Sequence, residues 1–214
     1  MNRLAVIFAA CALCVSSVAP FEQKAVTSSI KDIVAKHDHA ALIERLSALK
    51  LSDPRQFAVQ DHDYLLAHTA ESEGSTALAM ANYGSVASRD SVLRAYALAH
   101  LSRIARSTGN LLLERIYLKE LLMFSHEESF KPAAEHRLTR NAFESANYKE
   151  AIRLLASGSN RSVKSSPETV RENRVLLGEA YRMSGDVEKA KKIFDEILSS
   201  TPKVDQPDDA ALTA

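Results

Sequence analysis

Two short clusters of the sequence carry residue types that bind metals. His37-Asp38-His39 and Asp61-His62-Asp63 offer the imidazole and carboxylate groups that zinc prefers. Each cluster lies at a turn or helix start, where Asp caps the helix and His stays exposed. Adjacent residues of a helix also point in different directions, so a coordination sphere would need ligands from elsewhere. We therefore predict no metal and no cofactor at either cluster.

Cys11 and Cys14 form a CxxC pair, a spacing used by redox and metal sites. They lie in the apolar run 4–15, which is too short to span a membrane and is followed by small residues. This order is typical of a secretory signal peptide at residues 1–19, cut near Ala19. Lipidation of Cys11 is the alternative. Cleavage predicts a periplasmic or otherwise exported protein without a disulfide or a stable membrane span.

The composition limits the remaining function classes. The chain has 214 residues, with 27 basic and 27 acidic side chains, 46% hydrophobic residues, six Gly and six Pro. The low number of glycines and prolines favours helices, and the chain length fits one domain or one extended array. A formal net charge of zero argues against a nucleic-acid binder, which normally shows a basic face, so we expect no nucleic-acid partner, although a local basic patch stays open.

Turn signals recur along the chain at nearly constant spacing. They lie 36, 35, 37 and 39 residues apart when counted between Asp38, Gly74, Gly109, Ala146 and Gly185. Apolar residues at helical spacing flank each turn, and no segment alternates as a strand does. We therefore predict an all-α protein in which residues 20–214 form an α-solenoid of about five helix pairs, wound as a right-handed superhelix.

The last pair has a recognisable sequence, "LLGEAYRMSGDVEKAKKIFDEILSSTP" at 176–202. It resembles a tetratricopeptide repeat unit spanning 171–202, and seven residues match the motif: Leu177, Gly178, Tyr181, Gly185, Ala190, Phe194 and Pro202. Gly178 lets a partner helix approach closely, and Gly185 ends one helix before Asp186 starts the next. Arg174 departs from the motif, because a large apolar residue is usual there.

A second resemblance covers roughly residues 26–214. The segments "DHDYLLAHTAESEGSTALAMANYGSV", "RAYALAHLSRIARSTGNLLLERIYLKELL", "AFESANYKEAIRLL" and "VDQPDDAALTA" are similar to the N-terminal superhelical region of soluble lytic murein transglycosylases. That resemblance implies a curved helical region that carries a peptidoglycan-cleaving domain. The family's catalytic Glu lies in a Glu-Ser pair followed by a Gly-Leu-Met-Gln type segment. Glu71-Ser72 and Glu144-Ser145 lack that context and are expected to be solvated, so we predict no catalytic residue and no enzyme activity.

A binding surface of a solenoid is expected on the concave side, formed by the first helix of each pair. There we predict exposed arginines that meet acidic peptides or the anionic groups of peptidoglycan: Arg94, Arg103, Arg137, Arg140, Arg174 and Arg182. His100 is predicted to be a core histidine with a hydrogen-bond partner. The six tyrosines are expected to pack between helices, with a hydroxyl at the edge.

Two functions remain open. One is an exported, non-catalytic superhelical module, truncated at its C-terminus, that positions a peptidoglycan-cleaving domain absent from this chain. The alternative is a tetratricopeptide-type scaffold that binds protein partners in the cell envelope. The sequence does not name the partner.

Overall fold

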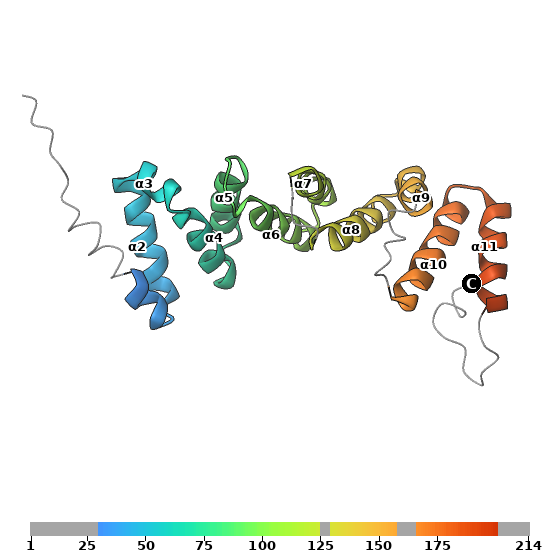
Figure 1. Ribbon diagram of the computed structural model, residues 1–214, viewed down its shortest axis with the longest axis horizontal. Coiled ribbons are helices and arrows are strands. Elements are labelled where there is room, and N and C mark those ends of the chain that lie inside the picture. The colour runs from blue at the N-terminus through green and yellow to red at the C-terminus, as the bar shows by residue number, and fades with distance from the viewer. Residues whose placement is uncertain (1–29, 125–128, 158–165, 201–214) are drawn as a thin grey trace, which may run out of the picture.

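The computed structural model describes residues 30–124, 129–157 and 166–200, and no strand occurs among them. Figure 1 shows an elongated array of helices. Helical residues 30–35 are followed by α2 (His39–Ser52), α3 (Pro54–Val59), α4 (His62–Ser72), α5 (Thr76–Ala87), α6 (Arg94–Ser107), α7 (Leu111–Phe124), α8 (Lys131–Glu144), α9 (Tyr148–Ala156), α10 (Pro167–Met183) and α11 (Val187–Ser200).

Five turns of one kind join these helices into pairs. Each contains a residue with positive φ: His37, Gly74, Gly109, Ala146 and Gly185. At each turn the following amide donates to the carbonyl five residues before it, as Ser75 donates to Ala70 at 2.8 Å and Asp186 to Tyr181 at 2.9 Å. This Schellman pattern satisfies carbonyls that a helix end leaves unpaired. The predicted recurrence of the turns is confirmed.

Polar side chains start the helices that follow. In four of the five turns the residue after the positive-φ position accepts a hydrogen bond from the amide three residues later: Asp38, Asn110, Asn147 and Asp186. Ser166 does the same for α10, accepting from the Thr169 amide at 3.1 Å, with Pro167 in the first turn. Such caps satisfy donors that the first helical turn cannot pair internally. Ser166 and Pro167 therefore define the start of α10.

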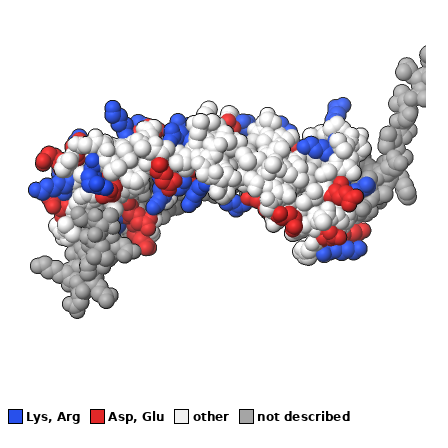
Figure 2. All heavy atoms as spheres, turned by 180° about the vertical axis from the view of Figure 1, so that it is seen from behind, with Lys and Arg blue, Asp and Glu red and all other residues white. Residues whose placement is uncertain are grey.

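Consecutive helices pack side by side and build two layers. In Figure 1, α4, α6 and α8 lie in one row, while α5, α7 and α9 lie above them. Each second helix also packs against the first helix of the next pair, because α5 contacts α6, α7 contacts α8 and α9 contacts α10. Figure 2 shows that the array is bowed, and its hollow side is the side of α4, α6 and α8. We call this the concave face and the opposite side the convex face. The predicted solenoid of about five helix pairs is confirmed.

The apolar core is largest in the middle of the array. Large buried side chains link α5, α6 and α7: Tyr83, Leu98, Leu101, Leu118 and Leu121. The buried cluster beneath the last two pairs contains only Ala142, Ala151 and Ala180, with larger side chains packed at its edge. Since burial of apolar area drives folding, the middle of the array has the greater hydrophobic stabilisation.

The final pair packs as the tetratricopeptide motif predicts. A Cβ atom added to Gly178 would lie 2.5 Å from Cε1 of Phe194, so glycine is needed for the close approach of α10 and α11. Gly185 ends α10 with φ +89°, and Ala190 is buried at the helix interface. Leu177 and Tyr181 are partly buried. Pro202, the last residue of the motif, lies outside the described residues.

The loop region before α4 differs from the prediction. Asp53-Pro54 ends α2 and also starts the short helix α3, because Asp53 accepts a hydrogen bond from the Gln56 amide at 2.9 Å. Asp61 has φ +51° and makes no cap hydrogen bond. Asp63 is buried, and both carboxylates bind the guanidinium group of Arg89. The expectation that an aspartate caps this helix was wrong, because Asp61 and Asp63 instead pair with Arg89, just beyond α5.

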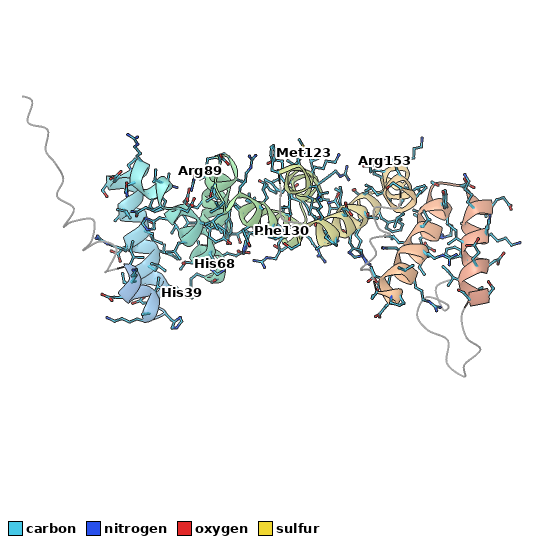
Figure 3. All side chains as sticks on the ribbon, viewed as in Figure 1. His39, His68, Arg89, Met123, Phe130 and Arg153 are labelled. Carbon is cyan, nitrogen blue, oxygen red and sulfur yellow. The ribbon has the colours of Figure 1, made fainter. Side chains whose placement is uncertain are left out.

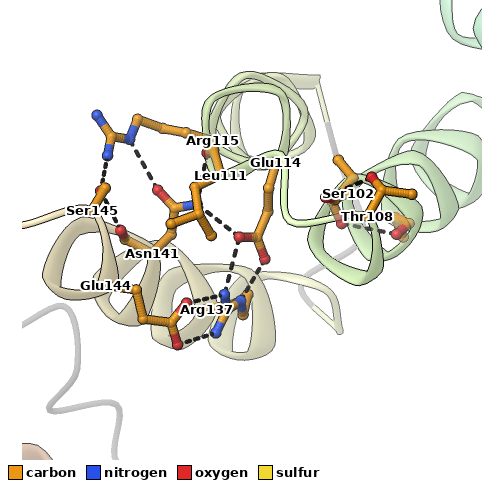
Figure 4. Close-up of polar contacts among 11 residues, drawn as sticks. Ser102, Thr108, Leu111, Glu114, Arg115, Arg137, Asn141, Glu144 and Ser145 are labelled. Atoms are coloured by element: carbon orange, nitrogen blue, oxygen red, sulfur yellow. Dashed lines mark hydrogen bonds and ion pairs between the residues drawn. The ribbon is translucent and has the colours of Figure 1, made fainter.

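A polar network ties α7 to α8 (Figure 4). Glu114 is 1% exposed and forms an ion pair with Arg137, which also binds Glu144. The side-chain amide of Asn141 donates to Glu114 at 2.7 Å and to the Leu111 carbonyl at 2.8 Å. A buried carboxylate requires such partners, because desolvation without them is costly. The predicted exposure of Arg137, which is 14% exposed, is therefore wrong. Glu144 is 42% exposed and solvated as predicted, although it pairs with Arg137.

Candidate interaction site

The concave face carries ring and charged side chains gathered around Glu71. They come from three consecutive helices: Tyr64, His68 and Glu71 on α4, Tyr83 on α5, and His100 and Arg103 on α6. We call this set the Glu71 cluster; Figure 3 shows its member His68 at the lower, concave edge. The His100 ring stacks on Tyr83 with centroids 4.7 Å apart. Tyr64 contacts Tyr83 and His100 edge-on at 5.5 and 6.0 Å, so the rings form one packed group.

Three side chains donate hydrogen bonds to the Glu71 carboxylate. The Tyr83 hydroxyl donates to Oε2 at 2.9 Å, and Nη2 of Arg103 donates to Oε1 at 2.7 Å. Nδ1 of His100 lies 2.7 Å from Oε2. His100 has the predicted hydrogen-bond partner but is partly buried, not in the core, and the predicted solvated Glu71 is wrong. Its side chain is 20% exposed and joins three helices.

These hydrogen bonds keep Glu71 ionised. Burial acts to raise the pKa of Glu71, but hydrogen bonds from Arg103, Tyr83 and His100 outweigh burial and lower it. Burial lowers the pKa of His100, although Glu71 acts in the opposite direction. His100 is therefore neutral at pH 7, and its Nδ1–H donates to the carboxylate. Burial, followed by the hydrogen bond to Glu71, raises the pKa of Tyr83, so its hydroxyl remains a donor.

Three exposed arginines come from the helices of the concave side. Arg103 and Arg106 lie on α6 and Arg140 lies on α8, and we call them the arginine row. The pKa of Glu144 is lowered first by its hydrogen bond to Arg137, and also by the charges of Arg106 and Arg140, which places both near this carboxylate. Within the described residues, neither Arg106 nor Arg140 forms an ion pair. Their guanidinium groups are open to a ligand.

The other four predicted arginines contact side chains of the chain itself, two of them in surface ion pairs. The Arg94 guanidinium lies 3.8 Å from the centre of the Phe124 ring. Arg137 is 14% exposed and holds the buried Glu114. Arg174 pairs with Glu196. Arg182 pairs with Glu179 at 2.6 Å. Of the six arginines expected to contact a ligand, the structure brings only Arg103 and Arg140 together in the arginine row.

Sequence reasoning missed the Glu71 cluster and Arg106, although a signal for the cluster exists. Tyr64-x3-His68-x2-Glu71 and Tyr96-x3-His100-x2-Arg103 repeat the same spacing 32 residues apart. Residues i, i+4 and i+7 share one helix face, so α4 and α6 each present a ring, a histidine and a charge in a row. Tyr96 is 39% exposed and contacts Phe130 edge-on at 5.1 Å, which extends the aromatic surface towards α8.

Neither predicted histidine cluster converges on one point. Asp38 caps α2, His37 is exposed, and Nδ1 of His39 lies 2.7 Å from Oε1 of Glu73. Among the described residues, no group of three His, Cys, Asp or Glu is placed to hold a metal ion. No helix in the same residues is long and apolar enough to cross a membrane.

The fold is similar to solved tetratricopeptide structures, whereas no protein-family model and no curated protein matches the sequence. A tetratricopeptide repeat protein from Parabacteroides merdae is 17% identical over 84% of this chain and 67% of its own, with a TM-score of 0.57. The MamA protein is 16% identical over 82% and 90%, with a TM-score of 0.55. The C-terminal part of a repeat protein from Cytophaga hutchinsonii is 13% identical over 83% and 65%, with a TM-score of 0.51. The chain has a tetratricopeptide-like fold.

That fold bears out the tetratricopeptide resemblance of residues 171–202 in its described part. At these identities the likeness shows the fold alone. The resemblance to the superhelical region of lytic transglycosylases rests on sequence pattern and stays a prediction, as does the export expected from residues 1–19, which lie outside the described residues.

Proposed function

We propose that this chain is a protein-interaction module whose concave face binds an acidic segment of a partner protein. The observation that carries the proposal is the arginine row, in which two exposed guanidinium groups have no ion pair among the described residues. Arginine binds carboxylates through two parallel hydrogen bonds and loses less hydration than lysine when it does so. The tetratricopeptide-like fold supports a scaffold role, since such arrays present extended concave surfaces.

The Glu71 cluster adds a surface with balanced charges beside the arginine row, which shares Arg103 with it. Glu71 balances Arg103, and His100 is neutral at pH 7, so the cluster contributes no net charge. The rings of Tyr64, His68 and Tyr96 are partly or fully open to solvent. Aromatic rings and arginines are enriched in protein interfaces. A segment that combines acidic residues with an apolar side chain fits this surface best.

We further propose that the module is not an enzyme and acts outside the cytoplasm. A glycosidase general acid needs a raised pKa, whereas the pKa values of Glu71 and Glu144 are lowered. Export is supported by the sequence pattern of residues 1–19. The competing hypothesis is a peptidoglycan-associated superhelical region that positions a cleaving domain. Its anionic ligand would contact the same arginines, so the experiment must distinguish the two ligands.

The test measures binding of labelled peptides and of purified peptidoglycan to the full chain. We expect a Glu- and Asp-rich peptide that contains Phe to bind, and a Lys-rich peptide of equal length not to bind. Arg106→Glu combined with Arg140→Glu should weaken binding of the acidic peptide at least ten-fold, and added salt should weaken it further. Lys191→Glu with Lys192→Glu is the matched control, because both lysines are exposed on α11 away from the arginine row.

Each outcome decides between the hypotheses. Loss of peptide binding in the arginine variant alone supports the proposed function. Sedimentation of the chain with peptidoglycan, without peptide binding, would favour the peptidoglycan hypothesis. Release of glycan fragments in the same sample would contradict the proposal that the chain has no enzyme activity.

A further inference from the structure

The convex face of α5 and α7 differs from the rest of the convex face. Residues 3, 7, 10 and 14 positions after each positive-φ residue occupy equivalent places in the second helices. In α9 and α11 the first two of these places are charged and exposed: Lys149, Arg153, Glu188 and Lys192. In α7 the places hold Leu112, Ile116, Lys119 and Met123, and in α5 they hold Ala77, Ala81, Gly84 and Ser88. The first two of these positions are therefore uncharged in α5 and α7, whereas they are charged in α9 and α11.

The α7 residues project into solvent as an apolar ridge. Leu112 is 66% exposed, Ile116 42% and Met123 74%, and one helix face presents all three. Figure 3 shows Met123 at the upper edge, on the side opposite His68. Figure 2 shows few charged side chains over the middle of the molecule seen from behind. Lys119 lies between Ile116 and Met123 on this face, so three of the four places of the ridge are apolar. Clustered exposed apolar residues favour an interaction site, whereas single ones are ordinary.

The α5 residues form a low floor in the same row as this ridge, since Figure 1 shows α5 and α7 in one layer and both pack against α6. Gly84 lies inside α5, where glycine weakens a helix relative to alanine. Gly178 has an internal reason for glycine, because Phe194 occupies the space of its Cβ. A Cβ added at Gly84 would meet no atom within 4 Å. Nothing within the described chain requires glycine there, and its missing side chain leaves the floor open to a side chain of another molecule.

We propose that a second copy of this chain covers this surface, with the α7 ridge of each copy seated on the α5 floor of the other. A two-fold dimer requires a self-complementary surface. A surface that carries both a ridge and a floor fits this requirement, because each copy's ridge meets the other copy's floor. Net charge does not oppose association of two copies, because the formal net charge of the whole chain is zero. Lys119 on the ridge and Asp90 just beyond the floor are both exposed and provide opposite charges for the contact. This surface is separate from the concave site, so the dimer does not depend on the proposed function.

The size of the surface indicates a weak dimer. Helices of 12 and 14 residues are about 18–21 Å long, and two helix spacings give a width of about 20 Å. Each copy then contributes about 400 Å², and the total of about 800 Å² lies below the 1,200 Å² typical of stable complexes. We therefore expect a dissociation constant in the micromolar range, with exchange between monomer and dimer.

Sedimentation equilibrium of the full chain over micromolar concentrations tests the dimer. The average mass should rise from monomer towards dimer with concentration. Leu112→Lys combined with Met123→Lys should raise the dissociation constant at least ten-fold, and Gly84→Arg on the floor should do the same. Leu51→Lys is the matched control, since Leu51 is 86% exposed on α2, outside the ridge and floor.

Circular dichroism of each variant confirms that it is folded, and exposed positions should tolerate these changes. A wild-type chain that stays monomeric throughout would overturn the proposal. So would a dimer that the ridge variant leaves intact. Weakening by the ridge variant but not by Gly84→Arg would equally overturn the pairing of ridge and floor.

Discussion

At the scale of single residues, the turns of this protein show an unequal use of glycine. The backbone is left-handed at all five turns, but His37 and Ala146 occupy two of these positions with φ +54° and +56°. A Cβ atom in this conformation crowds the following carbonyl, and glycine avoids that crowding. The three glycine turns and the two others form the same Schellman hydrogen bonds. The strain at Ala146 is therefore local and can be removed by a single substitution.

We expect Ala146→Gly to raise the free energy of unfolding by about 0.5–1 kcal/mol, because relief of the strain exceeds the added entropy of the unfolded chain. The reverse change, Gly109→Ala, should lower it by about 1 kcal/mol. A Cβ at Gly109 meets nothing within 4 Å, so only the backbone conformation opposes it. Urea denaturation midpoints measure both variants. A lower midpoint for Ala146→Gly would show that the turn has relaxed around alanine.

Single residues also show which roles can be predicted from the sequence and which cannot. Gly178 and Gly185 could be placed correctly because their roles depend on the helix pair that contains them. The role of Glu71 depends on His100 and Arg103, which lie 29 and 32 residues away in the next pair. Helical spacing identifies which residues share a face, but it does not show which faces of neighbouring helices meet. The Glu71 cluster therefore appeared only in the structure.

At the scale of elements, the charge of a side chain does not by itself predict whether that side chain is exposed. Arg137 was expected to face a ligand because it lies on a first helix, yet Glu114 on the preceding helix binds it internally. Five turns and their helices could be predicted from recurring local signals. The pairing of α7 with α8 through buried charges could not, since a buried and an exposed arginine have the same sequence signature.

Arg137→Met should lower the free energy of unfolding by about 3–5 kcal/mol, because it leaves the buried Glu114 carboxylate without its cation. Arg153→Met is the control: Arg153 is exposed and pairs with Glu150 three residues away, so its loss should cost at most about 0.5 kcal/mol. Adding Glu114→Gln to Arg137→Met should recover part of the loss. Thermal and urea unfolding of the three variants measure these differences. Equal effects of Arg137→Met and Arg153→Met would mean that the α7–α8 pair is worth no more than a surface pair.

At the scale of the whole molecule, stability should vary along the array. Helices of a solenoid contact mainly their sequence neighbours, so its repeats form partly independent units. Leu98, Leu101, Leu118 and Leu121 fill the middle of the core, whereas the buried cluster beneath the last two pairs is made of alanine. Less buried apolar area means a smaller free energy of opening. The α10–α11 pair should therefore open more readily than α6 and α7.

Native-state hydrogen exchange tests this prediction amide by amide. Amides of α11 should exchange through an opening of lower free energy than amides of α6. Ile197→Ala removes a buried side chain from the last pair, so it should lower protection by about 2–4 kcal/mol in α10 and α11 and leave α6 unchanged. Leu101→Ala, at an equally buried site in the middle, should lower protection in α5, α6 and α7 as well as in the helices that depend on them. If Ile197→Ala instead lowered protection equally from α4 to α11, the array would unfold as one unit. The concave site and the convex ridge would then share a single stability, and the weak last pair could not open without them.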